Sequence, residues 1–159
     1  VEGTSEHHGA IGGRAIVYIG GFVFEHDLGE VFISGSRFTF PGSPPSWLAP
    51  DVAFVSAARL SRIGFSDGYS RRIPDLVLEV KPPSNTEADI HEKVSIYLGG
   101  GVRIVWLVRP IERTGAVFRP HGPERILDEN DVLDGEDVLP GFRRPLSELF
   151  RGPRGSQSE

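Results

Sequence analysis

One seven-residue run, Asp75-Leu-Val-Leu-Glu-Val-Lys81, constrains the fold of this chain more than any other segment. It predicts a β-strand, whose side chains alternate between two faces. One face carries only leucine and valine, whereas the other carries Glu79 and Lys81, with Cα atoms about 6.6 Å apart. A buried strand normally avoids Glu and Lys together unless they are paired or bind something. This face is therefore a candidate site, and the alternative is an exposed ion pair on an edge strand.

The rest of the chain predicts an α+β fold. Apolar periodicity indicates a helix over Ser5–His26 and another after Ser84-Asn-Thr-Glu87, which has the spacing of a capping box with the serine as N-cap. Pro41–Pro50, with four prolines, and residues 57–74 predict loops. The order of elements favours a mixed β-sheet with an antiparallel meander, one helical crossover and flanking helices. Further strands are expected at Glu30–Ile33 and Arg37–Phe40 around the turn Ser34-Gly35-Ser36, and at Asp51–Val55, Arg103–Val108 and Ala116–Arg119.

Length and composition indicate one ordinary globular domain. The chain has 159 residues, which suits a single domain over residues 1–151 with a flexible polar tail over 152–159. It contains no cysteine, which excludes disulfides, thiolate metal sites and cysteine catalysis and suits a reducing cytoplasm. The strongly apolar stretch Ala15–Phe24 is too short to span a bilayer, so we expect no membrane association.

The charge balance weighs against a simple nucleic-acid-binding surface. Seventeen Lys and Arg against 22 Asp and Glu give a net charge of −5. Proteins that bind DNA mainly by neutralising phosphates are usually basic. A function on DNA therefore needs a local patch or a metal ion. Arg59, Arg62, Arg71 and Arg72 could form such a patch, and a solvated loop is the alternative.

Asp51 is the expected partner of the acidic strand face. If Asp51–Val55 and Asp75–Lys81 are antiparallel neighbours, Asp51 lies beside Glu79 and Lys81, whereas Asp75 lies about 13 Å from Glu79. Two carboxylates with a backbone oxygen suit magnesium or manganese. Such an ion polarises a phosphodiester and activates water, which a neighbouring lysine can orient. Alternatively, Asp51 is a turn residue that follows a proline.

Five motifs in order along the chain resemble one known family. They are Pro50-Asp51-Val-Ala-Phe-Val, Pro74-Asp75-Leu-Val-Leu-Glu79-Val-Lys81, Lys93-x-x-x-Tyr97, Gly101-Val-x-x-Val-Trp106-Leu-Val-x-Pro110 and Leu139-Pro-Gly-Phe142. Together they resemble the Uma-two (Uma2) family, a branch of the PD-(D/E)XK nuclease superfamily, from about His7 to Phe150. The resemblance implies a restriction-endonuclease-like fold, DNA cleavage that depends on Mg²⁺ or Mn²⁺, and a homodimer.

The resemblance also implies residue roles. Asp51 and Glu79 correspond to metal ligands, and Lys81 to the catalytic lysine of the E-x-K element. Lys93 corresponds to a helix lysine that can take that catalytic role, so the choice between Lys81 and Lys93 stays open. Glu6 corresponds to a helix acid that supplements metal binding in related nucleases.

Several alternatives remain at this stage. Lys93 could instead pair with Asp89 one helical turn earlier. His7 and His8 diverge on a helix and do not predict a zinc site, and Tyr97 and Trp106 are expected in the core. The function could also be that of a dimeric interaction or regulatory module that keeps the nuclease fold without its activity. Hydrolysis of RNA or another phosphodiester would use the same site.

Overall fold

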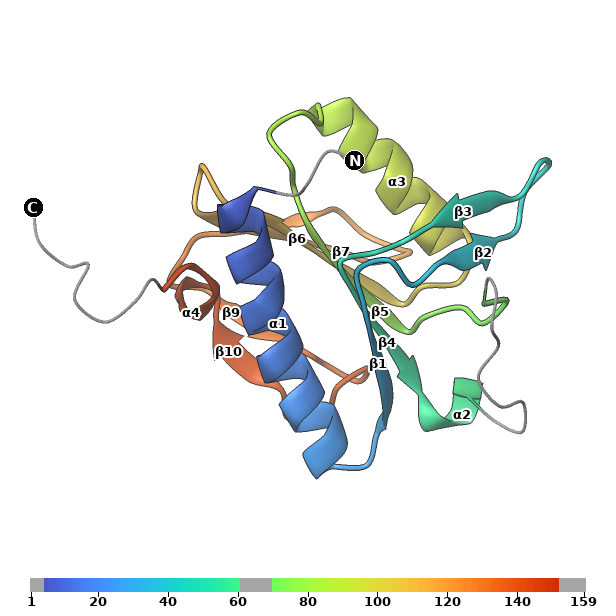
Figure 1. The fold of residues 1–159 in the computed structure, drawn as a ribbon, viewed down its shortest axis with the longest axis horizontal. Coiled ribbons are helices and arrows are strands. Elements are labelled where there is room, and N and C mark those ends of the chain that lie inside the picture. Colours follow the sequence, from blue (N-terminus) through green and yellow to red (C-terminus); the bar gives the residue numbers. More distant parts are fainter. Residues whose placement is uncertain (1–4, 61–69, 152–159) are drawn as a thin grey trace, which may run out of the picture.

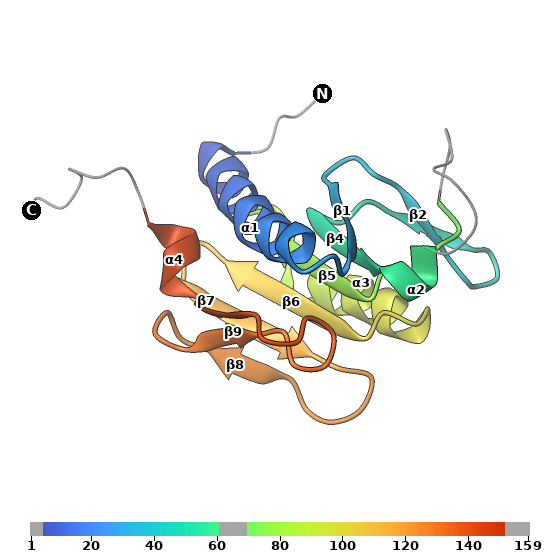
Figure 2. The same ribbon diagram turned by 90° about the horizontal axis from the view of Figure 1, so that it is seen from below.

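A computed structural model describes residues 5–60 and 70–151 of the chain. At its centre is a six-stranded sheet (Figure 1), and its strand order is β1-β4-β5-β6-β7-β8. Helix α1 (Glu6–Glu25) packs on one face of this sheet and helix α3 (Glu87–Gly99) on the other (Figure 2). The strands of the sheet are β1 (Gly29–Ile33), β4 (Val52–Ser56), β5 (Leu76–Val80), β6 (Ile104–Arg109), β7 (Thr114–Phe118) and β8 (Arg125–Leu127).

The sheet is mixed, as the order of elements predicts. β5 and β6 are parallel neighbours, and α3 is the crossover between them. All other neighbouring strands of this sheet are antiparallel. A parallel pair needs such a long connection, whereas antiparallel strands can be joined by short turns. The α+β fold class is therefore confirmed.

Helix α1 begins with a side-chain cap and buries one stripe. The Ser5 hydroxyl oxygen accepts a hydrogen bond from the backbone N–H of His8 at 3.1 Å, which satisfies one of the free donors of the first turn. Ile11, Ala15 and Ile19 are almost fully buried against the sheet. Their spacing of four residues keeps them on one side of the helix.

Helix α3 begins two residues later than the sequence predicts. Its N-cap is Thr86, whose side chain accepts from the Asp89 N–H at 3.1 Å, while the Asp89 carboxylate accepts from the Thr86 N–H at 2.8 Å. The expected cap at Ser84 is wrong, because Thr86 and Asp89 have the same capping-box spacing and take both bonds. The helix ends at Gly99, as expected, and Gly101 has the left-handed φ of 110° that favours glycine.

The two strands expected on either side of the turn Ser34-Gly35-Ser36 are present, but they do not pair with each other, because β1 pairs with β4 in the central sheet. β4, the partner of β1, is buried along nearly its whole length. The segments expected as loops also contain regular structure. Strand β2 (Phe38–Phe40) pairs with β3 (Ser46–Leu48), and a short helix α2 (Ala57–Leu60) follows β4. Near the end of the chain, β9 (Val132–Asp134) pairs with β10 (Arg143–Pro145), and helix α4 (Ser147–Phe150) follows. The sequence patterning misses these short elements or bounds them differently.

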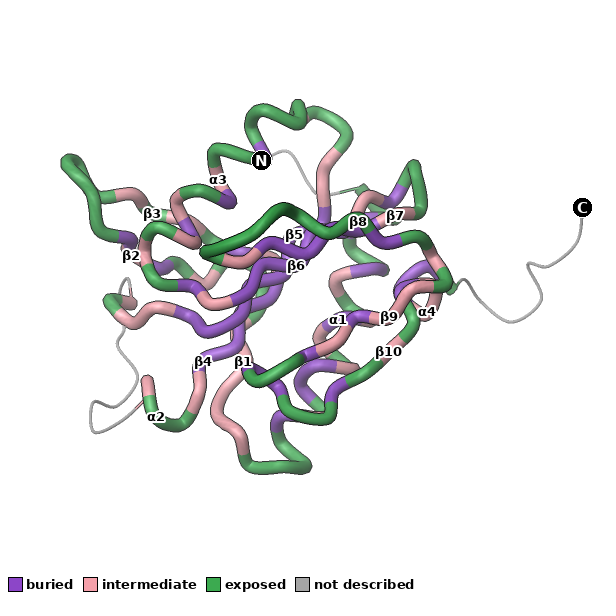
Figure 3. The backbone as a smooth tube through the Cα atoms, turned by 180° about the vertical axis from the view of Figure 1, so that it is seen from behind, coloured by how far each residue is buried: buried purple, intermediate pink, exposed green. Residues whose placement is uncertain are grey.

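The core has two parts, one on each side of the sheet. Leu76, Leu78 and Val80 of β5 face the α1 side, and Val77 faces the α3 side. Figure 3 shows the resulting band of buried backbone along the central strands. The alternation predicted for Asp75–Lys81 is thus confirmed, and it places Glu79 on the α3 side.

No helix in the described parts of the chain is both long and apolar enough to cross a membrane. Residues 152–159, predicted to form a flexible tail, lie outside the described residues.

Candidate active site

Asp51 and Glu79 meet where β4 begins and β5 ends. In the antiparallel register Val52 faces Leu78, so the next pair along the two strands is Asp51 and Glu79. The Asp51 carboxylate accepts a hydrogen bond from the backbone N–H of Val80 at 2.7 Å, which fixes it against the end of β5. The neighbouring strands thus bring two carboxylates together, as the sequence predicts.

Glu79 is buried among groups from helix α3. It is 6% exposed, and its Oε1 accepts a hydrogen bond from the Tyr97 hydroxyl at 2.5 Å. Lys93 Nζ lies 4.0 Å from the same oxygen. Burial, and next the charge of Asp51, raise the pKa of Glu79 to about 8, although Lys93 and the Tyr97 hydrogen bond act in the opposite direction. The alternative of an exposed ion pair on an edge strand is therefore wrong, because Glu79 is buried and β5 lies between β4 and β6.

The lysine beside Glu79 is Lys93. Its Nζ faces Glu79 from one turn before Tyr97 on α3, whereas the Asp89 carboxylate accepts the helix-cap hydrogen bond, so the structure favours Glu79 over the alternative partner Asp89. The backbone N–H of Lys81 donates to Val108 at 2.8 Å, and its ammonium lowers the pKa of Glu87 after the larger effect of Arg109. Lys81 therefore follows Glu79 closely along the chain but acts electrostatically on a different carboxylate, Glu87.

His8 is a site residue that the sequence analysis missed. Its Nε2 lies 3.3 Å from Asp51 Oδ2, and its side chain is nearly buried. His8 precedes Ile11 by three residues, so extending the buried stripe of α1 toward its N-terminus would have placed it against the sheet. The neighbouring His7 is exposed, as the divergence of adjacent helical residues requires.

Glu6 is exposed in the first turn of α1. Within residues 5–60 and 70–151, no three His, Asp or Glu side chains gather closely enough to hold a metal ion. The structure therefore does not bring Glu6 together with Asp51 and Glu79, and its role as a supplementary ligand remains a prediction.

The chemistry of this cluster nevertheless fits a divalent cation. Two carboxylates converge in a nearly buried place, and the raised pKa of Glu79 shows that Asp51 and burial disfavour its negative charge. One ammonium at 4.0 Å balances only part of the two charges. Carboxylate oxygens are hard ligands that suit Mg²⁺ or Mn²⁺, and such ions keep several waters when few protein ligands are present.

The family model described as "Putative restriction endonuclease" (Uma2) matches residues 1–147 of this chain. The chain belongs to the Uma2 family. The structure is also similar to the crystal structure of "a putative nuclease belonging to DUF820" from Anabaena variabilis, with a TM-score of 0.82 and 21% sequence identity. That match covers 94% of this chain and 83% of the other, and it supports the restriction-endonuclease-like fold. A search of curated protein sequences finds no match.

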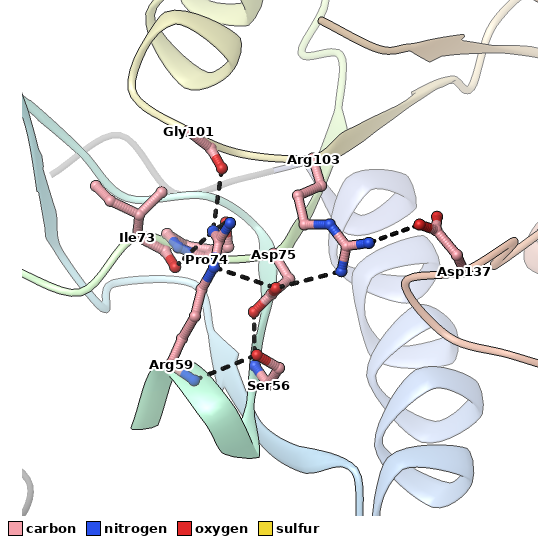
Figure 4. A network of polar contacts seen from close by, with 8 residues as sticks. All are labelled: Ser56, Arg59, Ile73, Pro74, Asp75, Gly101, Arg103 and Asp137. Atoms are coloured by element: carbon pink, nitrogen blue, oxygen red, sulfur yellow. Dashed lines mark hydrogen bonds and ion pairs between the residues drawn. The ribbon is translucent and has the colours of Figure 1, made fainter. Parts of the chain in front are cut away.

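Asp75, the acid directly before β5, has a structural role in this Uma2 chain. It is 2% exposed at the opposite end of the strand from Glu79 and accepts the backbone N–H of Ser56 at 2.7 Å (Figure 4). Arg59 Nε and Arg103 Nη1 lie 3.3 and 3.6 Å from its Oδ1. These contacts connect β4, α2, β5 and the start of β6, at a distance from the candidate site.

The arginine patch is only partly described. Arg59 also donates to the backbone carbonyls of Ile73, Pro74 and Gly101, so it stabilises local structure and does not form a free DNA-facing charge (Figure 4). Arg62 lies outside the described residues. Tyr97 and Trp106 are buried, as predicted, and Tyr97 additionally contacts Glu79.

Proposed function

We propose that this Uma2 chain is a divalent-metal-dependent endonuclease that hydrolyses DNA phosphodiester bonds. The observation that carries the proposal is the convergence of Asp51 and Glu79 at the end of two neighbouring strands, with Lys93 Nζ 4.0 Å from Glu79. Membership of the Uma2 family supports nuclease chemistry.

Asp51 and Glu79 would hold the cation, Mg²⁺ or Mn²⁺. When bound, it would polarise the phosphodiester and lower the pKa of a bound water. Lys93 would orient the attacking water and stabilise the negative charge that develops on the phosphate. Tyr97 holds Glu79, and the Val80 N–H and His8 hold Asp51, so these groups position the two carboxylates. Glu6 would become a third ligand only if helix α1 moved closer to Asp51 and Glu79 when the cation binds.

Lys93 is the better candidate for the catalytic lysine. Among the groups that shift the pKa of Glu79, the only lysine is Lys93, and it opposes the effect of burial. Lys81 acts on Glu87. We therefore assign the water-orienting role to Lys93 and propose that Lys81 contributes to binding the substrate near the site.

A second candidate function has its own observation. The net charge of −5 is unfavourable for a surface that binds phosphates, and the described residues contain no three-ligand metal cluster. These facts suit a homodimeric interaction or regulatory module without nuclease activity. Light scattering of the purified chain measures dimerisation, and cleavage assays separate the module from the enzyme.

A cleavage assay with matched variants tests the proposal. The purified chain is incubated with DNA and, separately, RNA in Mg²⁺, Mn²⁺ or EDTA. We expect metal-dependent cleavage of DNA by the wild type and a loss of at least about 100-fold in Glu79→Gln. The control Glu92→Gln changes an exposed carboxylate of α3 and should keep full activity. Cleavage that persists equally in Glu79→Gln would contradict the proposed site, and RNA cleavage alone would correct the substrate.

A further inference from the structure

A pocket of about 270 Å³ lies beside Asp51. Helix α1 forms one wall with His8, Gly9, Gly12, Gly13 and Ile16, and the end of β1 contributes Ile33 and Ser34. Asp51 belongs both to this pocket and to the carboxylate pair with Glu79. Anything bound in the pocket would therefore lie next to the site of the proposed hydrolysis.

The α1 wall of the pocket is open because it has almost no side chains. A Cβ atom added at Gly9, Gly12 or Gly13 would meet nothing within 4 Å. Each glycine inside a helix costs about 1 kcal/mol relative to alanine. The part of α1 that borders Asp51 therefore loses helix stability at three positions. At these positions the missing side chains leave room for a flat group to approach the backbone.

The charges around the pocket disfavour a phosphate as its occupant. Among the described residues, its lining contains no lysine or arginine, and the ionisable groups are His8 and Asp51, which already contact each other. The remaining walls are mainly apolar, and Ile33 is 61% exposed in the free protein. An uncharged ring would cover this isoleucine, and the Ser34 hydroxyl could bond to a polar edge of the ring.

We propose that this pocket receives the deoxyribose and base of the nucleotide next to the cleaved phosphate, an inference that rests on the proposed function. The volume is slightly below the range of about 300–1,000 Å³ that holds drug-sized ligands, so it suits one nucleoside unit and not a base pair. The base must leave the stack to enter the pocket, and unstacking is least costly in DNA that is already unpaired. The preferred substrate is therefore single-stranded or locally unpaired DNA.

Two matched glycine variants test this inference. Gly12→Leu would fill the pocket, whereas Gly21→Leu changes an α1 glycine that does not line it, and a Cβ has free space at both positions. Both proteins should fold, because leucine is a better helix former than glycine, and thermal unfolding checks this. The binding probe is 2′-deoxyadenosine, titrated without metal and followed by the backbone amide NMR signals of Gly9 and Gly13, with inorganic phosphate as the control probe.

We expect saturable shifts of these signals with 2′-deoxyadenosine and none with phosphate. Binding should weaken by about tenfold or more in Gly12→Leu and stay unchanged in Gly21→Leu. Absence of binding to the wild type, or equal binding to Gly12→Leu, would overturn the inference. Shifts with phosphate alone would overturn the assignment of an uncharged occupant.

Cleavage kinetics separate this inference from the proposed function. We expect the wild type to cut single-stranded DNA with a higher kcat/KM than the same sequence as a duplex, and an abasic nucleotide at the cutting point to raise KM. If DNA is cleaved but strandedness, abasic substitution and Gly12→Leu have no effect, the pocket inference is wrong and the nuclease function stands. If no nucleic acid is cleaved, the proposed function is wrong, and the nucleoside titration still decides whether the pocket binds.

Discussion

The Tyr97 hydroxyl donates a hydrogen bond to Glu79 Oε1 at 2.5 Å and thereby connects helix α3 with the end of strand β5. This bond lowers the pKa of Glu79 against the larger opposing effect of burial. The side chain of Glu79 is thus held from one side by α3, while Asp51 approaches it from the neighbouring strand.

Tyr97→Phe tests whether this hydrogen bond positions Glu79. The variant keeps the ring and its packing against Phe40, so we expect a loss of only about 1 kcal/mol in the free energy of unfolding. Metal affinity should fall by about 10- to 100-fold, the usual effect of removing a partner of a ligand. The pH profile of cleavage should also move to higher pH, because Glu79 loses a donor that favours its charged form.

The control for this experiment is Tyr18→Phe on α1, where the ring contacts Arg144. It should change neither metal affinity nor the pH profile. Equal metal affinity and an equal pH profile in Tyr97→Phe and the wild type would show that Tyr97 only fills the core.

The raised pKa of Glu79 predicts how stability depends on pH without divalent metal. Between about pH 4.5 and 8 the unfolded chain releases the proton of Glu79 while the folded protein keeps it. Since the folded state then binds more protons, its stability falls as pH rises through this window. Glu79→Gln should remove this contribution, so its free energy of unfolding should decline less over the same range.

Urea denaturation at a series of pH values in EDTA measures this difference. The quantity to compare is the difference in the free energy of unfolding between wild type and Glu79→Gln at each pH, because this subtracts the contribution of groups remote from Glu79. A difference that stays constant from pH 4.5 to 8 would contradict the raised pKa.

Lys93→Ala and Lys81→Ala test the assignment of the catalytic lysine. Because Lys93 faces Glu79, we expect its removal to lower kcat by at least about 100-fold, the lower end for a group that assists proton transfer. Lys81→Ala should mainly raise KM. The reverse order of effects on kcat would assign catalysis to Lys81.

Asp75→Asn tests the structural network at the other end of β5. It leaves Arg59 and Arg103 without their buried partner, which we expect to destabilise the fold by about 3 kcal/mol, the lower end for a broken buried ion pair since both arginines are partly exposed. Asp137→Asn is the control, because this carboxylate also pairs with Arg103 but is 81% exposed and should cost less than about 1 kcal/mol. Urea denaturation measures the free energy of unfolding of both variants. Equal stability of Asp75→Asn and the wild type would contradict the structural role of Asp75.

The central strands could be predicted because their patterning is unambiguous. The apolar alternation of β5 and the antiparallel pairing of β4 place Asp51 beside Glu79 without further information. The partner of β1 could not be predicted from the local turn at residues 34–36, because β1 pairs with β4, which follows β2 and β3 along the chain. The cap of α3 was misplaced for a similar reason, since two overlapping sets of residues have the same spacing.

The sequence predicts the two carboxylates of the candidate site but not the groups that surround them. The adjacency of His7 and His8 predicts no metal site, whereas the position of His8 in the buried stripe of α1 predicts contact with the sheet. The choice between Lys81 and Lys93 depends on how α3 packs over β5, which the spacing along the chain does not contain.

Calorimetric titration with Mg²⁺ and Mn²⁺ tests the central claim most directly, because it needs no substrate. The account predicts one binding site in the wild-type chain, lost or weakened by at least about tenfold in both Asp51→Asn and Glu79→Gln and kept in the control Glu92→Gln. Absence of binding to the wild type, or binding that both site variants retain unchanged, would contradict the claim that Asp51 and Glu79 together hold a divalent cation.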